Sequence, residues 1–182
     1  MRVITNAGDM IIELYTDRAP LSAEAFLRYV DEGRFERATF YRSVRMDNDR
    51  GLPQIAVIQI APSNFDELPQ LTVEHESTAR TGILHLNGTV SLGRERPGTG
   101  SPGAFFVCIG DQPHLNHGGK RSQDGQGFAA FGRVIVGMDV ARSIHGQSTL
   151  PDAPNSYLQG QILAEPIGIS IARREKQLTE ES

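Results

Sequence analysis

Apolar and polar residues alternate along much of this chain in short stretches, a pattern typical of β-strands with one buried face. Nineteen glycines and ten prolines punctuate these stretches, as turn residues do in an all-β barrel or sandwich. The predicted strands are Val3–Thr5, Met10–Tyr15, Thr39–Val44, Ile55–Ile60, Ile83–Leu86, Thr89–Leu92, Phe105–Ile109, Phe128–Val134 and Ile167–Ile171.

Two turn sequences predict β-hairpins. Asn6–Asp9 separates the first two predicted strands. Asn87-Gly88 separates Ile83–Leu86 from Thr89–Leu92 and is the strongest two-residue hairpin signal in the chain, because such turns favour Asn-Gly.

Two segments have helical spacing instead. Ser22 is the expected N-cap of a helix over Ala23–Glu32, and Gly33 is its expected stop. A second helix is expected over Met138–Ile144, between two glycines. About eight strands with two helices predict a mainly β fold, a closed antiparallel eight-stranded β-barrel capped by two α-helices. Residues 1–172 are expected to form one domain, followed by a flexible charged tail over residues 173–182.

Composition narrows the function classes. The chain has 182 residues, 38% hydrophobic and 22% charged, which is ordinary for one soluble globular domain. Its net charge of −4 argues against nucleic acid as the main partner. No apolar run approaches the ~20 residues that span a bilayer, and Cys108 has no second cysteine with which to pair. The N-terminus shows no signal-peptide pattern. A cytoplasmic location is therefore the default, and a removed signal segment would allow a periplasmic or secreted one.

Arg42 is the first candidate for chemistry, because it lies on a strand otherwise made of β-branched and aromatic residues. Alternation predicts that Phe40, Arg42 and Val44 share a face, and that Val57 and Gln59 share a face on the later strand. If these strands are neighbours, Arg42 and Gln59 can meet. From the residues alone, an arginine in a surface salt bridge is the favoured alternative.

The same alternation separates neighbouring residues on two later strands. Phe106 points away from Phe105, so one phenylalanine enters the core and the other can line a pocket. Ile58 lies on the face opposite to Val57. From the residues alone, two core phenylalanines are the favoured alternative.

Three segments in order carry a family resemblance. They are F-Y-R-S-V…I-A-V-I-Q over Phe40–Gln59, S-L-G-R-E-R-P-G-T-G-S-P-G-A-F-F-V-C over Ser91–Cys108, and F-A-A-F-G-R-V over Phe128–Val134. Together they resemble the cyclophilin family of peptidyl-prolyl cis–trans isomerases, as a divergent, loop-expanded bacterial-type member. The similarity runs through most of Val3 to Ile144.

This resemblance implies roles for individual residues. Arg42 would be the catalytic arginine and Gln59 its hydrogen-bonding neighbour. A proline pocket and a groove for the preceding residues would hold the peptide. The residues implied to bind it are Val57, Gly93, Ala104, Phe106, His114, Leu115 and Phe128.

The chain also departs from the family pattern. Ala56 stands where a pocket phenylalanine is usual, Phe128 replaces a common histidine, and His114 replaces a tryptophan. Arg45–Gly51 is expected to be an inserted polar loop, and Gly118–Gly127 an extra loop. These changes predict a reshaped pocket.

Three other signals favour ordinary structural roles. Gly98, Gly100 and Gly103 spell G-x-G-x-x-G, but a strand is predicted after them where a dinucleotide site needs a helix. The His114-x-x-His117 pair lacks further ligand support, so surface histidines are expected. Cys108 is expected to be a small buried hydrophobe.

The predicted function is isomerisation of X-Pro bonds in peptides and unfolded protein clients, by a monomer without cofactor or metal. No nucleic acid or membrane partner is expected. The alternative is a peptide-binding or chaperone-like module on the same barrel, with catalysis weakened or lost through the Ala56 and Phe128 changes.

Overall fold

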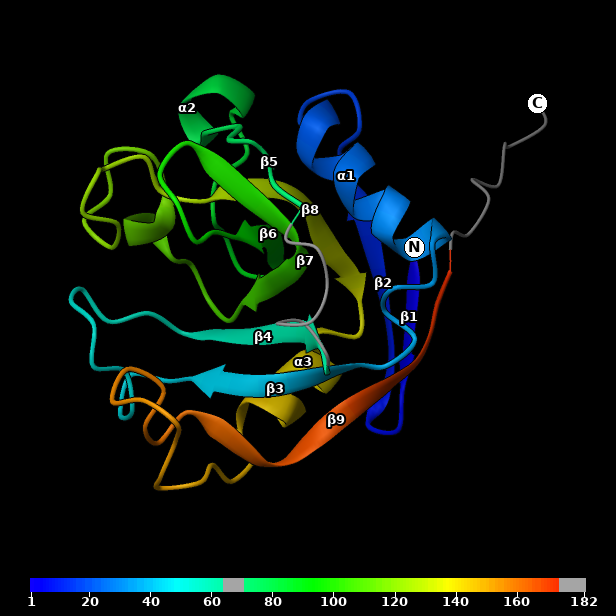
Figure 1. Ribbon diagram of the computed structural model, residues 1–182, viewed down its shortest axis with the longest axis vertical. Coiled ribbons are helices and arrows are strands. Elements are labelled where there is room, and N and C mark those ends of the chain that lie inside the picture. Colours follow the sequence, from blue (N-terminus) through cyan, green and yellow to red (C-terminus); the bar gives the residue numbers. More distant parts are fainter. Residues whose placement is uncertain (64–70, 174–182) are drawn as a thin grey trace.

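The computed structural model describes residues 1–63 and 71–173. Its strands are β1 (Arg2–Thr5), β2 (Gly8–Leu14), β3 (Ala38–Val44), β4 (Val57–Pro62), β5 (Val73–Glu74), β6 (Thr89–Gly93), β7 (Thr99–Cys108), β8 (Ala129–Val136) and β9 (Ile162–Arg173). Eight of them form an antiparallel ring in the order β4-β3-β9-β1-β2-β8-β6-β7, which closes where β7 pairs with β4 (Figure 1). The predicted closed eight-stranded barrel is thus confirmed. The short strand β5, which the pattern did not predict, adds to β7 outside the ring.

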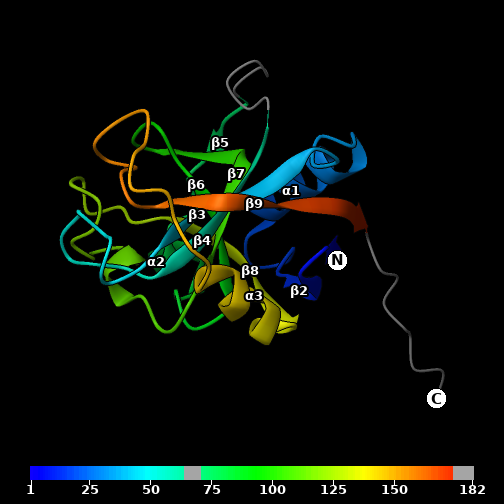
Figure 2. The ribbon, with the colours of Figure 1, turned by 90° about the horizontal axis from the view of Figure 1, so that it is seen from below.

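Two longer helices pack against different strands of the barrel. Helix α1 (Pro20–Asp31) contacts β7 and β8, whereas α3 (Met138–His145) contacts β2, β3 and β4. Figures 1 and 2 show the two helices well apart, with strands between them. A third helix, α2 (Thr78–Thr81), has four residues and was not predicted by the pattern. None of its residues belongs to the hydrophobic core of the barrel.

Aromatic rings join α1 to the barrel interior. The Phe26 ring of α1 lies 5.0 Å from the Phe105 ring on β7 and 5.0 Å from the Phe131 ring on β8. All three side chains are almost fully buried. Because buried aromatic side chains contribute much of the apolar area of a core, these contacts hold the helix on the barrel.

The predicted start of α1 is wrong. The helix begins at Pro20, whose fixed φ and missing N–H suit the first helical position. Ser22 therefore lies inside the first turn, where its backbone N–H donates to Glu76 Oε2 at 2.7 Å. The glycine after the helix, Gly33, has φ +67° as predicted for a stop.

The predicted strand over Ile83–Leu86 is also wrong, although the Asn87-Gly88 turn is present. The backbone N–H groups of three residues in this segment bond to side chains and not to a neighbouring strand. His85 N donates to Asn116 Oδ1 at 2.9 Å, and Leu86 N donates to Thr89 Oγ1 at 3.0 Å. Side chains that satisfy backbone donors in this way compete with a β-ladder.

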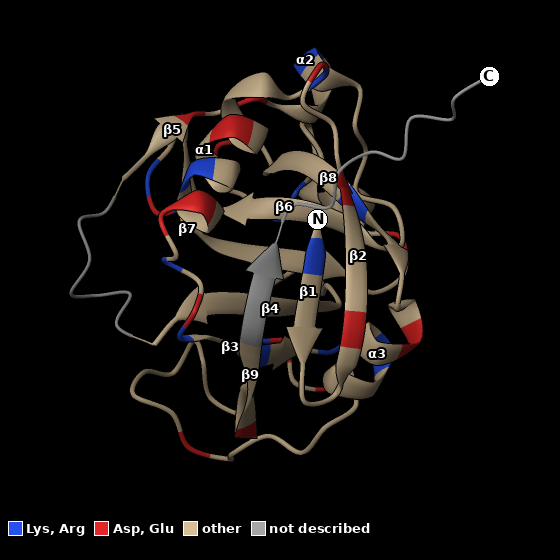
Figure 3. Ribbon diagram, turned by 90° about the vertical axis from the view of Figure 1, so that its right-hand side faces the viewer, with Lys and Arg blue, Asp and Glu red and all other residues tan. Residues whose placement is uncertain are grey.

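Charged residues of both signs are interspersed over the face shown in Figure 3, without separation by sign. No helix among the described residues has the length and apolar character needed to span a membrane. Of the predicted tail, Arg173 ends β9, and residues 174–182 lie outside the described residues.

Candidate functional site

Strand pairing brings Arg42 and Gln59 together. Arg42 on β3 is the register partner of Gln59 on β4, and its Nη1 donates to Gln59 Oε1 at 3.1 Å. The Arg42 side chain is nearly buried, with 7% of its residue surface exposed. The alternative of an arginine in a surface salt bridge is therefore wrong.

Arg42 and Gln59 belong to a row of register partners that extends over two more strands of the barrel. Gln59 is the register partner of Phe106 on β7, and Phe106 is the partner of Ser91 on β6. Neighbouring strands lie about 4.8 Å apart, so the backbone of Phe106 lies about 10 Å from that of Arg42. One row across four strands thus carries a guanidinium, an amide, an aromatic ring and a hydroxyl.

A β-bulge changes the side chain directions along β3. The register shifts between Phe40 and Arg42 on both neighbouring strands. As a result Phe40 packs in the barrel core, whereas Val44 belongs to a second apolar cluster. The predicted common face of Phe40, Arg42 and Val44 is wrong, because the extra residue of a bulge breaks the period-2 alternation.

The second apolar cluster, here called the outer cluster, is separate from the barrel core. Its partly exposed member Phe128 presents its ring 5.5 Å from that of Phe106, nearly perpendicular to it. The buried members are Val44, Ile55, Val57, Phe106, Cys108 and Leu115. Predicted pocket residues Val57, Phe106, Leu115 and Phe128 therefore lie together.

Alternation is confirmed on the two strands that carry the outer cluster. Phe105 points into the core and Phe106 into the outer cluster, while Val57 and Ile58 divide in the same way. Cys108 is fully buried in the outer cluster, as expected of a small hydrophobe, and burial raises the pKa of its thiol well above the usual range.

A buried histidine supports Phe106. The His85 ring stacks on the Phe106 ring, with 6.1 Å between centroids and 15° between planes. Its ring nitrogens lie 2.8 Å from Asn116 Oδ1 and 3.0 Å from Ser91 Oγ. Burial lowers the pKa of His85 to about 4, so the ring is neutral at neutral pH.

Two residues that the sequence patterns did not reveal complete the surroundings of Arg42. Gln161 Oε1 accepts hydrogen bonds from Arg42 Nε at 2.9 Å and from Nη2 at 2.6 Å. The Tyr157 ring lies over the guanidinium, 4.7 Å from Arg42 Cζ to the ring centroid. Both residues follow α3 in a segment without strand or helix periodicity, so no local signal pointed to them.

The pKa of Tyr157 reflects this contact. The residue is 53% exposed. Partial loss of water around its hydroxyl raises the pKa, but the guanidinium groups of Arg42 and Arg121 outweigh that effect and leave the pKa below its usual value. Two positive charges near one phenol favour its ionised form.

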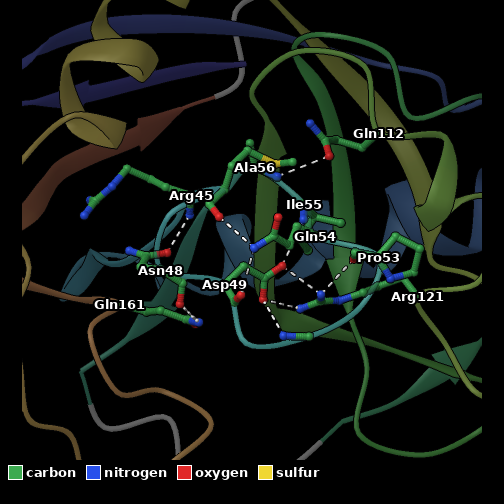
Figure 4. A network of polar contacts seen from close by, with 12 residues as sticks. Arg45, Asn48, Asp49, Pro53, Gln54, Ile55, Ala56, Gln112, Arg121 and Gln161 are labelled. Carbon is green, nitrogen blue, oxygen red and sulfur yellow. Dashed lines mark hydrogen bonds and ion pairs between the residues drawn. The ribbon is translucent and has the colours of Figure 1, made fainter.

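The loop predicted as an insertion is fixed by polar contacts (Figure 4). Arg121 forms a two-pronged ion pair with Asp49, with Nη1 2.7 Å from Oδ2 and Nη2 2.9 Å from Oδ1. The Asp49 side chain is fully buried, and it also accepts the backbone N–H groups of Gly51 and Ile55. The loop before β4 is thereby joined to the loop after Leu115.

The predicted groove residues lie side by side. A Cβ added to Gly93 on β6 would be 3.2 Å from the carbonyl oxygen of Ala104 on β7. Next to them, Arg94 Cζ lies 5.5 Å from the centroid of the Phe128 ring, and Arg94 Nη2 donates to Asp124 at 2.7 Å. That bond holds the pKa of Asp124 at about 2.

His114 lies apart from the outer cluster. Its side chain is exposed and lines a surface depression with Thr78 and Ala79 of α2, His117 and Lys120. Its predicted role in binding a peptide stays a prediction.

Other motifs do not form sites among the described residues. Gly100 and Gly103 belong to β7, so the G-x-G-x-x-G run does not open a helix. Within residues 1–63 and 71–173, no group of three histidine, cysteine or acidic side chains is placed to hold a metal ion. Ala56 belongs to neither apolar cluster, and its backbone N–H donates to Gln112 Oε1 at 3.2 Å.

Comparison with known sequences supports the same family along most of the chain. Residues 1–159 match the family model of the cyclophilin type peptidyl-prolyl cis-trans isomerase/CLD. Peptidyl-prolyl cis-trans isomerase B of Escherichia coli is 29% identical over 147 residues, covering 80% of this chain and 83% of that protein. Peptidyl-prolyl cis-trans isomerase cyp18 of Streptomyces antibioticus is 31% identical over 147 residues, covering 80% and 82%.

Solved structures show the same fold. A cyclophilin type peptidyl-prolyl cis-trans isomerase of Cryptosporidium parvum matches with a TM-score of 0.63 and 17% identity, covering 92% of this chain and 94% of that one. Its structure in the presence of the dipeptide Ala-Pro matches with a TM-score of 0.61 and 18% identity, covering 92% and 96%.

Proposed function

The chain belongs to the cyclophilin-type peptidyl-prolyl cis–trans isomerase family, and from this we propose that it isomerises X-Pro bonds at the row formed by Arg42, Gln59 and Phe106. The activity follows from the family, and the roles of individual residues are our proposal. The observation that carries it is the nearly buried Arg42 guanidinium, which lies in register with Gln59 and, one strand further, with Phe106.

The reaction needs a donor more than a nucleophile. Rotation about the X-Pro bond breaks amide resonance, with a barrier of about 18–20 kcal/mol. In the twisted state the proline nitrogen becomes pyramidal and its lone pair localises. A hydrogen-bond donor that cannot lose its proton stabilises that nitrogen and so lowers the barrier, and arginine is such a donor.

The partners of Arg42 suit this role. The hydrogen bonds described for its guanidinium go to two neutral amides, Gln59 and Gln161. Neutral acceptors hold the group in place without cancelling its charge. In a nearly buried position that charge acts on a bound peptide with little screening by water.

The outer cluster is the proposed seat of the proline ring. Phe106 and Phe128 meet edge to face, and Val57 and Leu115 pack beside them. An apolar surface of this kind holds the ring while the preceding residue rotates. Gly93 and Ala104 are the proposed border for that preceding segment, because neither carries a large side chain.

The natural substrates proposed are X-Pro bonds in unfolded protein clients, acted on by a monomer with a single domain over residues 1–172. The structure determined in the presence of Ala-Pro supports proline-containing peptides as the substrate class. A cytoplasmic location stays a prediction.

The first test is the isomerisation rate of an X-Pro peptide, measured by NMR exchange for the wild type and for Arg42→Ala. Loss of one preorganised donor lowers kcat/KM by roughly a hundredfold to a thousandfold. Arg42→Lys keeps the charge but not the forked donors, so little of the rate returns. Arg28→Ala, whose side chain is 72% exposed on α1, is the matched control and keeps the wild-type rate. Equal rates for wild type and Arg42→Ala would overturn the assignment of Arg42.

A further inference from the structure

The segment that follows α3 returns to the side of β3 that carries Arg42. Gln161 immediately precedes β9, and its carbonyl oxygen accepts the backbone N–H of Ser43 at 2.9 Å. The next residue, Ile162, is the register partner of Arg42. Backbone pairing therefore fixes Gln161 beside Arg42, although 119 positions separate them in the sequence.

The side chain amide of Gln161 is fully buried and bonded at both ends. Its Nε2 donates to the carbonyl oxygen of Asn48 at 3.0 Å, and its Oε1 accepts from Arg42 Nε and Nη2 (Figure 4 shows Gln161 and Asn48). Since a carbonyl oxygen can only accept, the contact with Asn48 requires the amide oxygen to face Arg42.

Asn48, the loop residue that accepts from Gln161, is itself held in place by hydrogen bonds. Asn48 Nδ2 donates to the carbonyl oxygens of Ser43 at 3.1 Å and Gly160 at 2.9 Å. Asn48 Oδ1 accepts the backbone N–H of Arg45 at 2.7 Å. A side chain held by such a network keeps one rotamer, as the residue that orients a reacting group needs to do.

These contacts restrict the guanidinium. Of its five N–H donors, Nε and Nη2 are held by Gln161 and Nη1 by Gln59, and the ring of Tyr157 covers its face. At most two donors, both on the terminal nitrogens, remain for a peptide. Without Gln161, a single bond to Gln59 and the contact with the Tyr157 ring would remain to hold the group.

We propose that Gln161 is a positioning residue for catalysis, which sets the plane of the Arg42 guanidinium through a buried, neutral, two-pronged hydrogen bond. This inference rests on the proposed role of Arg42. It extends the site to the segment after α3, beyond residues 1–159 that match the family model.

The test compares three substitutions at position 161. Gln161→Met removes the acceptor and lowers kcat by about tenfold to a hundredfold, as misplacement of a catalytic group does, with a small change in KM. Gln161→Glu still accepts from Nε and Nη2, so its kcat lies between those of the wild type and Gln161→Met. Its stability is the lowest, because a buried carboxylate then faces the Asn48 carbonyl. In Gln161→Asn the side chain is one methylene shorter and its amide does not reach Arg42, so its kcat is as low as that of Gln161→Met. If Gln161→Met does not fold, Gln161→Asn takes its place in the test.

The control and a second measurement separate positioning from folding. Gln112→Met removes another buried amide that bonds Ala56 N and the carbonyl oxygen of Ile109, so it lowers stability and leaves kcat unchanged. The NMR signal of Arg42 Nε–H exchanges slowly with solvent in the wild type and in Gln161→Glu, and quickly in Gln161→Met.

Each outcome is decisive. If Arg42→Ala has wild-type activity, the proposed function of Arg42 fails. If Arg42→Ala is inactive but Gln161→Met keeps the wild-type kcat, or if kcat simply follows stability across the three variants, the role of Gln161 fails while that of Arg42 stands.

Discussion

Among individual residues, the site depends on polar groups that are buried and held by several hydrogen bonds. Arg42, Gln161 and His85 are each at most 7% exposed, and each makes at least two described hydrogen bonds. A buried polar group costs free energy unless it is paired, so such groups have one favoured geometry. His85 is informative because its buried ring is neutral at neutral pH and stacks on Phe106.

We expect the contribution of His85 to stability to disappear in acid. Its pKa lies near 4 in the folded protein and near 6.5 in the unfolded chain, so the unfolded state binds more protons between these values. Stability is unaffected above pH 6.5 and falls as the pH drops toward 4, by roughly 3 kcal/mol from this group. The measurement is urea unfolding of the wild type and His85→Asn from pH 7 to pH 4.

The difference between these two proteins isolates His85 from the other titrating groups. The advantage of the wild type over His85→Asn shrinks by about 3 kcal/mol across this range. A constant difference between the wild type and His85→Asn across this range would show that His85 is not buried neutral in solution.

At the scale of elements, distant side chains decide where segments begin and how they join. The carboxylate of Glu76, 1% exposed, accepts a backbone N–H in the first turn of α1 from 54 residues away. This position suits a negative charge, since the helix dipole is positive at that end. The buried pair of Asp49 and Arg121 joins two loops in a similar way.

Glu76→Ala is expected to lower the free energy of unfolding by about 2 kcal/mol, because a buried N–H loses a charged acceptor. Glu76→Gln keeps an acceptor and loses less. Glu74→Ala is the control, since Glu74 forms an exposed ion pair with Arg80, worth at most about 1 kcal/mol. Urea denaturation measures all three variants, and equal losses for Glu76→Ala and Glu74→Ala would contradict the capping role.

In the molecule as a whole, the residues that stabilise the barrel and the residues of the proposed site lie on opposite faces of the same strands. The core inside the ring holds α1 and the barrel strands together, and the outer cluster lies on the other face of β4 and β7. Adjacent phenylalanines on β7 serve these two purposes, because successive side chains of a strand point to opposite faces.

This arrangement makes Phe105 and Phe106 a matched pair. Phe105→Ala leaves a cavity among the rings of Phe26 and Phe35 and costs about 3–5 kcal/mol, with wild-type activity per folded molecule. Phe106→Ala costs less stability, since its ring packs in the smaller outer cluster, but lowers kcat/KM by at least about tenfold. Thermal unfolding and the X-Pro exchange rate, measured on both variants, check this; the reverse pattern would place the proposed site elsewhere.

Features that depend on neighbouring residues could be predicted from the residue pattern. Alternation assigned Phe105, Phe106, Val57 and Ile58 to their faces, and the spacing of apolar residues located α3, because side chain direction follows from local backbone geometry. Family resemblance added Arg42 and Gln59 as a pair.

Features that depend on distant partners became visible in the folded chain alone. The bulge in β3, the capping of α1 by Glu76 and the contact of Gln161 with Arg42 leave no local pattern. Each arises because closing the barrel buries polar groups, and a buried group must take whichever partner the closed ring brings within reach. Residues 119 positions apart can therefore share one site without any signal in the sequence around either of them.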